Sequence, residues 1–306
     1  MISLERAGAP KRAKSRYNRL TPLDFFIYGA VSVFALFCVL PFLLILMVSF
    51  TEEVAIIKNG YSLFPEAFST EAYQMVFRNG SAIFQSYGIS IVITVLGTVL
   101  AVCITAMAAF TLANKSVKCR KGLSFFFFFT MIFNAGIVPW YMMCRSLGLM
   151  DNLGALIVPG LMFNAFNLFL VRNFMNGIPD SLLESAKLDG ANEIVIAFRI
   201  YFPLSVPVLA AVTLFYALGY WNDWWNAIML IDNNKLYPLQ YFLFKLQSEI
   251  KMLKDLQMQS ASAGVSLPSE SVKMATVIVT IGPIVFLYPF LQKYFVKGLV
   301  IGGVKG

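Results

Sequence analysis

The stretch Ile178-Pro-Asp-Ser-Leu-Leu-Glu-Ser-Ala-Lys-Leu-Asp-Gly-Ala-Asn192 is a short polar segment between two long apolar runs. Pro179 suits the first position of a helix, and Asp180 suits its positively polarised N-terminal end. Gly190 can adopt the left-handed conformation that stops a helix. These signals predict a helix of about two turns, followed by a second short helix from Asn192 to near Pro203.

One face of this predicted helix is apolar, because Leu182, Leu183 and Ala186 are spaced i, i+1 and i+4. A helix this short is not stable alone in water. We therefore expect its apolar face to pack against another part of the chain or against a partner.

Six apolar runs without a charged residue surround this segment. A bilayer core of about 30 Å needs about 20 helical residues, and each run is close to that length or longer. The composition agrees, since 58% of the 306 residues are hydrophobic and only 13% are charged. The sequence predicts an all-α membrane protein with six transmembrane helices, at residues 25–50, 79–114, 122–144, 152–171, 201–222 and 274–292.

The basic residues predict the orientation of these spans. With the N-terminus inside, the inner segments 1–24, 115–121, 172–200 and 293–306 carry 16 of the 24 lysines and arginines. The remaining 8 are spread over the outer loops. Basic residues prefer cytoplasmic loops, so both termini are predicted to be cytoplasmic. The run 25–50 is too long for a signal-peptide core and is expected to remain as an anchor.

The residue types and motifs that the sequence lacks argue against several classes of protein. It has no histidine, which argues against Ser-His-Asp catalysis and most zinc sites, and its four cysteines lack metal-site spacing. The net charge of +8 is distributed between apolar runs, so no nucleic-acid-binding face is expected. The spans contain no ionisable residue, which disfavours an ion-coupled carrier. No phosphate-binding loop is present, so we expect a transport subunit, not an enzyme, with any ATP bound by another polypeptide.

The central segment resembles a known signature. Glu184-Ser-Ala, three residues, Gly190, nine residues, Ile200, two residues and Pro203 is similar to the E-A-A-x3-G-x9-I-x-L-P signature of bacterial ATP-binding-cassette (ABC) importer permeases. The departures are Ser185 for Ala and Phe202 for Leu. The resemblance implies the type I importer permease fold, with a coupling helix near 179–190 that contacts an ATPase. The residues that it implicates are Leu182, Leu183, Glu184, Ala186, Asp189, Gly190 and Pro203.

The resemblance extends over nearly the whole chain. Tyr220-Trp-Asn-Asp-Trp-Trp225 and the ending from Gln292 to Gly306 are similar to the second permease of carbohydrate importers, such as the maltose and oligosaccharide or polysaccharide systems. This implies a core permease domain at 83–292 after the outer loop 51–82. It also implies an outer loop at 223–273, which faces a binding protein, and a cytoplasmic tail at 293–306.

The resemblance further implies the assembly and its location. The expected partners are a second homologous permease, two ABC ATPase subunits and an extracytoplasmic solute-binding protein, all at the bacterial cell membrane. ATP and Mg are expected on the ATPase subunits, and no cofactor or metal is expected in this chain. A non-sugar ABC substrate, an ion-coupled carrier and a non-transporting scaffold remain alternative interpretations.

Candidate substrate residues combine amides and aromatic rings, because sugars are bound by stacking and by hydrogen bonds. We expect Asn134, Asn164, Asn167, Trp221 and Asn222 to line the substrate pathway. Bonds between helices and an interfacial aromatic belt are alternative roles for these residues. In the outer loop, apolar residues recur at helical spacing after Pro238 and predict an amphipathic helix.

Overall fold

The computed structural model describes residues 22–78, 80–259 and 270–282, and within these ranges the chain is helical. The only strand-like pairing in the described residues is an isolated bridge between Thr51 and Phe68. The elements are α1 Pro22–Ser49, α2 Glu53–Asn59, α3 Glu71–Phe77, α4 Gly80–Ala113, α5 Arg120–Ile132, α6 Ile137–Ser146, α7 Leu153–Ile157, α8 Ala165–Met175, α9 Asp180–Leu188, α10 Glu193–Ile196, the π-helix η1 Ala197–Tyr201, α11 Phe202–Leu204, α12 Val206–Trp221, α13 Trp225–Leu230, the 3-10 helix η2 Asn234–Leu236, α14 Leu239–Gln259 and a helix over 270–282. The all-α prediction is confirmed.

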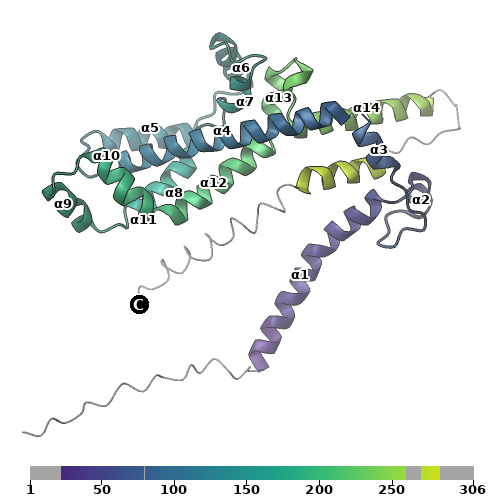
Figure 1. Cartoon of the computed structure of the whole chain (residues 1–306), viewed down its shortest axis with the longest axis horizontal. Coiled ribbons are helices and arrows are strands. Elements are labelled where there is room, and N and C mark those ends of the chain that lie inside the picture. The colour runs from purple at the N-terminus through teal and green to yellow at the C-terminus, as the bar shows by residue number, and fades with distance from the viewer. Residues whose placement is uncertain (1–21, 79, 260–269, 283–306) are drawn as a thin grey trace, which may run out of the picture.

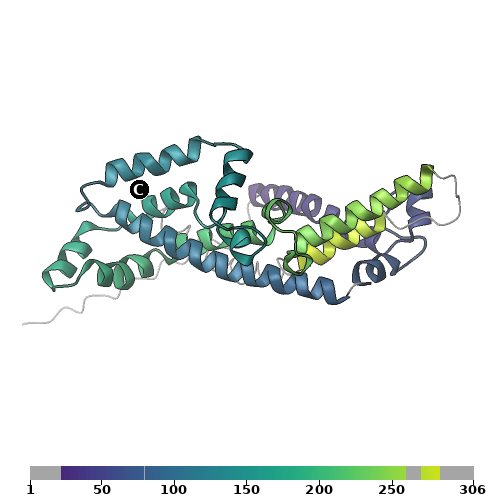
Figure 2. The same cartoon turned by 90° about the horizontal axis from the view of Figure 1, so that it is seen from above.

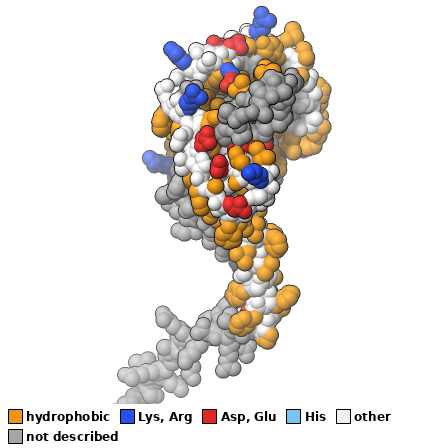
Figure 3. All heavy atoms as spheres, turned by 90° about the vertical axis from the view of Figure 1, so that its right-hand side faces the viewer, with side chains coloured by type: hydrophobic (Ala, Val, Ile, Leu, Met, Phe, Trp, Pro, Cys, Tyr) orange, Lys and Arg blue, Asp and Glu red, His pale blue; other side chains and the backbone are white. Residues whose placement is uncertain are grey.

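Two of the predicted spans are long, continuous helices. α1 and α4 are long and apolar enough to cross a membrane, and their bounds lie close to the predicted runs 25–50 and 79–114. α1 leaves the body of the molecule and buries almost none of its surface on the described residues. Figure 3 shows its column of exposed hydrophobic side chains, which suits contact with lipid or another chain.

The predicted run 122–144 is broken. The chain bends by 117° between α5 and α6, so these residues do not form one straight span. The turn between them has a local cause, because Gly136 has a φ of +85° and its amide donates to Oδ1 of Asn134 at 2.8 Å. Asparagine side chains stabilise such turns by bonding to the backbone two residues on.

The runs 152–171 and 201–222 are also interrupted. In the first, α7 and α8 are separated by residues 158–164, which contain Pro159 and the left-handed Gly160. In the second, α12 follows Glu193–Leu204 at an angle of 82°, close to Pro203, Pro207 and the π-helix η1. Proline and π-helical turns are common causes of such bends. The run 274–292 is helical to residue 282, and its remainder lies outside the described residues.

The core forms where α4, α8 and α12 pack together (Figure 1). α4 contributes small residues such as Ala101 and Ala109, which allow α12 to approach closely. The closest approach is at Gly97, where an added Cβ would lie 2.6 Å from Cε1 of Tyr220. The buried Tyr220 hydroxyl also donates to the carbonyl of Ile157 at 2.8 Å.

The two ends of α4 carry different structures. The α9–α11 segment lies near its C-terminal end, whereas α3, α14 and the helix over 270–282 lie near its N-terminal half. α14 and the helix over 270–282 run side by side (Figure 2) and share a cluster that includes Leu243, Ile250 and Val272. The predicted amphipathic helix after Pro238 is therefore confirmed as α14.

Candidate functional site

α9 is a nine-residue helix with a defined end, as the sequence predicts. Gly190 has a φ of +81° and donates its amide to the carbonyl of Lys187 at 3.1 Å. The next amide, of Ala191, donates to the carbonyl of Ala186 at 3.0 Å. These two bonds form a Schellman motif, in which the left-handed glycine allows its own amide and the next amide to satisfy two of the last helical carbonyls. Asn192 then caps α10 by accepting from the amide of Val195 at 2.8 Å.

The inner face of α9 anchors it to the rest of the chain. Ala186 is buried in the main core cluster, and Leu183 packs against that cluster. Polar contacts add to this anchor: Lys115 forms an ion pair with Asp180, and Lys187 pairs with Glu193 at 3.0 Å. These contacts position a helix that would not be stable by itself.

The outer face of α9 remains available for a partner. Leu182 and Leu188 are 43% and 89% exposed, and Glu184 and Asp189 are exposed beside them. Of the predicted coupling residues, Leu182, Glu184, Asp189 and Gly190 thus lie on the surface. Pro203 is exposed too, but it lies on α11, at the bend before α12.

The predicted pathway residues do not form one group. Asn164 caps α8, and its Oδ1 accepts from the amide of the buried Asn167 at 3.1 Å. Trp221 is buried in the cluster below α14, and its indole donates to the carbonyl of Thr280 at 3.2 Å. Asn222 is exposed and accepts from Gln240 at 3.1 Å.

Asn134 lies in an open hollow where α5, α6, α13 and the 158–164 segment meet. The hollow has a volume of about 440 Å³. Its polar and aromatic lining residues are Asn134, Trp140, Asp223, Trp225 and Asn226. It therefore combines two indole rings, two amides and one carboxylate, which suits a ligand with both C–H faces and hydroxyl groups.

Asp223 is the charged group of this hollow. Its Oδ1 caps α13 by accepting from the amides of Trp225 and Asn226 at 3.1 and 3.2 Å. Its Oδ2 is buried and accepts no hydrogen bond from the described residues. Burial raises the pKa of this carboxyl above its ordinary value, although the hydrogen bonds from Asn226 and Trp225 oppose the shift.

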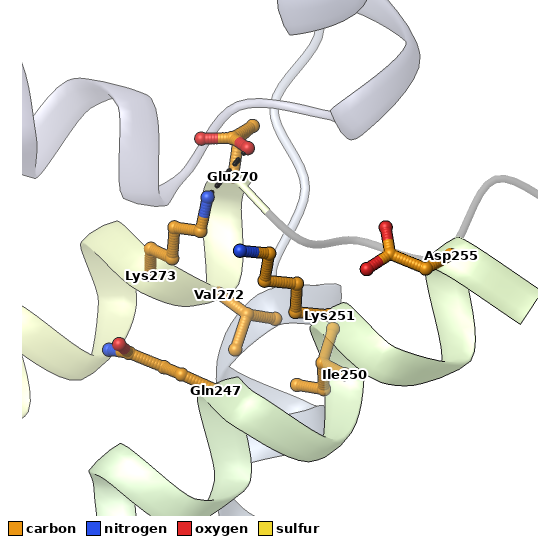
Figure 4. Close-up of a pocket in the computed structure, with 7 residues that line it drawn as sticks. All are labelled: Gln247, Ile250, Lys251, Asp255, Glu270, Val272 and Lys273. Carbon is orange, nitrogen blue, oxygen red and sulfur yellow. Dashed lines mark hydrogen bonds and ion pairs between the residues drawn. The ribbon is translucent and has the colours of Figure 1, made fainter.

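A second hollow lies between α14 and the helix over 270–282 (Figure 4). It measures about 170 Å³, and the amine of Lys251 points into it beside the Glu270–Lys273 ion pair. The buried Glu53 of α2 accepts from the amides of Glu270 and Ser271 at 3.0 Å each. An acidic side chain is favourable at a helix N-terminus, so this contact links α2 to the last described helix.

Sequence reasoning selected Asn134 for the pathway but not its neighbours Trp140 and Asn226. A signal was available for part of this set, since Asp223 and Trp225 stand beside the chosen Trp221 and Asn222. Successive residues after the end of α12 point in different directions, so the choice among them depends on where the helix ends.

Comparisons with known proteins agree with this architecture. Residues 99–301 match the family described as binding-protein-dependent transport system inner membrane component. The polygalacturonan/rhamnogalacturonan transport system permease protein YtcP of Bacillus subtilis (strain 168) is 38% identical over 94% of this chain and 99% of its own length. The arabinooligosaccharides transport system permease protein AraQ of Halalkalibacterium halodurans is 28% identical over 89% of this chain and 93% of its own length.

A solved structure is similar over the same extent. One chain in the crystal structure of a bacterial ABC transporter involved in the import of the acidic polysaccharide alginate superposes with a TM-score of 0.75. It is 32% identical, and the match covers 90% of this chain and 98% of that one. The fold, the family match and the similarity to YtcP agree, and this chain belongs to the family of binding-protein-dependent transport system inner membrane components, the permeases of ABC importers.

Proposed function

We propose that this chain is one of two permease halves of an importer that uses ATP to move an oligosaccharide into a bacterial cell. A homologous permease supplies the other half of the pathway, and two ATPase subunits bind ATP and Mg. An extracytoplasmic binding protein delivers the sugar. The observation that carries the proposal is α9, a short helix that the fold anchors on one face and exposes on the other.

The proposed mechanism is alternating access driven through α9. Closure of the ATPase subunits on ATP moves α9, and its anchors to Lys115 and Glu193 transmit the movement to α4 and α10. Because α10 to α11 continue into α12, the movement reaches the core helices. This chain makes and breaks no covalent bond.

The proposed topology has six spans and both termini in the cytoplasm. Its support is that α9 and the basic loop 115–121 lie near the same end of α4 (Figure 1), in agreement with the preference of basic residues for the cytoplasm. A membrane-impermeant maleimide provides the test on single-cysteine variants. Cys119, exposed in this loop, should react only in opened cells, whereas the Ser62→Cys variant should react in intact cells. The reverse pattern would contradict the orientation.

The proposed substrate class rests on the hollow around Asn134. Indole faces stack on sugar C–H surfaces, and the amides and carboxylate can bond to hydroxyl groups. The names of similar proteins point the same way, since they refer to polygalacturonan and rhamnogalacturonan, arabinooligosaccharides and alginate. We therefore propose that Asn134, Trp140, Asp223, Trp225 and Asn226 contact the passing sugar.

Co-purification tests the coupling role. The tagged chain, isolated in mild detergent, should bring a second permease and an ATPase with it. Leu182→Asp should remove the ATPase but leave the second permease, because it places a charge on the outer face of α9. Ile57→Asp is the matched control, since Ile57 is an exposed apolar residue of α2 near the opposite end of α4. Equal ATPase recovery with both variants would contradict the proposal.

Neighbouring tryptophans test the substrate role. Trp225 lines the hollow, whereas Trp224 stacks on Phe244 with ring centroids 5.3 Å apart and does not line it. They are 43% and 40% exposed, so they form a matched pair. Trp225→Ala should lower uptake of the transported oligosaccharide by about tenfold, the effect of losing about 1.4 kcal/mol of stacking. Oligogalacturonides, arabinooligosaccharides and alginate oligosaccharides are the probes, and an equal loss for Trp224→Ala would count against the hollow.

A further inference from the structure

A third hollow lies beside the start of α9 and is distinctly basic. It measures about 450 Å³ and is formed by the loop after α4, the start of α5, the end of α8 and the start of α9. Its charged lining residues are Lys115, Arg120, Lys121, Arg172 and Asp180. We propose that this hollow binds the phosphate-bearing headgroup of an anionic phospholipid of the inner leaflet. This inference rests on the membrane orientation proposed above.

Three of the four cations have no acidic partner among the described residues. Lys115 pairs with Asp180, which leaves Arg120, Lys121 and Arg172 without an ion pair there. Cations gathered in one hollow repel one another unless an anion neutralises them. A phosphate group would provide that neutralisation.

Arg172 gives the clearest indication of a missing ligand. Its Nε is buried and has no hydrogen-bond partner in the described part of the chain. Its guanidinium lies 5.7 Å from the ring centroid of Phe169, which holds the side chain in place. A buried donor without an acceptor is costly, and the planar guanidinium matches two phosphate oxygens.

The N-terminal end of α5 also favours a bound anion. α5 begins at Arg120, and no side chain caps its N-terminus. Cations are unfavourable in the first turn of a helix, where the free amides already carry partial positive charge. Arg120 and Lys121 stand there nevertheless, and a bound phosphate would make their interaction with the helix end favourable.

The surface next to the hollow identifies the anion as a lipid. Lys121, Phe125 and Phe128 are spaced i, i+4 and i+7, so they share one face of α5. Phe125 is 70% exposed, and the exposed apolar face continues to Ile132. An acyl chain can lie along this face while its headgroup enters the hollow. A free phosphate ion or a carboxylate of another protein would make no use of that face.

Native mass spectrometry of the purified full-length chain tests the proposal. The chain is exchanged into micelles with equal amounts of phosphatidylglycerol and phosphatidylcholine, and retained lipid is counted. The unchanged chain should retain phosphatidylglycerol in preference. Arg172→Gln should lower this retention by tenfold or more, and Lys121→Gln by about fivefold, the effect of one cation near an anionic headgroup. Lys121 is exposed, so its variant keeps the test valid if Arg172→Gln does not fold.

The matched control is Lys118→Gln, since Lys118 is an exposed cation of the same loop that does not line the hollow. Equal loss with this control, equal retention of phosphatidylcholine, or displacement of the lipid by millimolar inorganic phosphate would each overturn the proposal. Lipid retention needs neither ATPase nor sugar. If phosphatidylglycerol is not retained but Cys119 reacts with the maleimide only in opened cells, only the lipid site is refuted. If Cys119 reacts in intact cells, the proposed orientation is refuted.

Discussion

The contact between α4 and α12 and the segment around α9 use glycine in opposite ways. Gly97 has no room for a side chain, because the ring of the buried Tyr220 lies against it. Gly190 has open space around it, but its φ of +81° is unfavourable for other residues. Gly97 permits α4 and α12 to pack closely, whereas Gly190 ends α9 and leaves that helix exposed. Packing forms the fold, and in the proposed mechanism the exposed helix is where the ATPase acts on it.

Replacing Gly97 should have the largest effect. Gly97→Ala places a methyl group against Tyr220, whose hydroxyl is fixed to Ile157, so we expect destabilisation of about 1–3 kcal/mol. Gly88→Ala is the control, because Gly88 lies on the same helix with nothing near its added methyl group, and it should be neutral or stabilising. Thermal unfolding in detergent measures both. Equal melting temperatures for the two variants would show that the α4–α12 contact leaves room for a methyl group at Gly97.

Replacing Gly190 should separate coupling from folding. Gly190→Val strains the end of α9, although a Cβ at this position meets no neighbour. We therefore expect normal membrane insertion, loss of the ATPase in co-purification, and ATP-driven uptake reduced at least tenfold.

The chain contains a matched control for this strain. Gly148 follows α6 with a φ of +70°, and its own amide and that of Leu149 bond to the carbonyls of Arg145 and Cys144 in the same motif. Gly148→Val should therefore cost similar stability yet retain the ATPase in co-purification. Loss of the ATPase with both variants would mean that strain alone disrupts the complex, and α9 would lose its special role.

Asp223→Asn should lower uptake several-fold while leaving the fold intact. Asparagine can still cap α13 through its Oδ1, but it removes a buried carboxylate from the hollow. Uptake assays and thermal unfolding together distinguish the two roles. A large drop in melting temperature would instead make Asp223 a structural residue.

The raised pKa of Asp223 also predicts how its replacement changes stability with pH. Since burial raises the folded-state pKa of Asp223, the folded state holds this proton more tightly than the unfolded state. The resulting stabilisation is fully present below the ordinary carboxyl pKa and is lost as the pH rises through the folded-state pKa. Asp223→Asn should therefore raise the melting temperature at neutral pH, and this gain should shrink as the pH is lowered towards the ordinary value.

Lys187→Gln should have the smallest effect. Lys187 bonds to Glu193 at 3.0 Å and to Ser116 at 3.2 Å, but its side chain is 38% exposed. Exposed ion pairs contribute about 0–1 kcal/mol and are screened by salt. The melting temperature should barely change, and coupling should weaken mildly at low salt only. A strong loss of coupling would show that this anchor transmits more of the movement of α9 than the buried Ala186.

Local signals made much of the fold predictable. The lengths of the runs 25–50 and 79–114 predicted α1 and α4, and proline and glycine predicted the bounds of α9. The interruptions were less visible, because Asn134 and Gly136 lie in a run whose composition is apolar throughout. Hydropathy reports the average character of a run, and a single turn hardly changes that average.

The candidate site, like the fold, was predictable from the sequence only in part. The sequence by itself determined that the chain is a helical membrane protein with a capped polar helix between two apolar runs, because apolar length and helix caps depend on neighbouring residues. Only the tertiary structure decided that Ala186 is buried while Leu182 is exposed, and that Asn134 meets Asp223 and Trp225. Those arrangements depend on how helices distant in sequence pack together, and no local pattern encodes the packing of two distant segments.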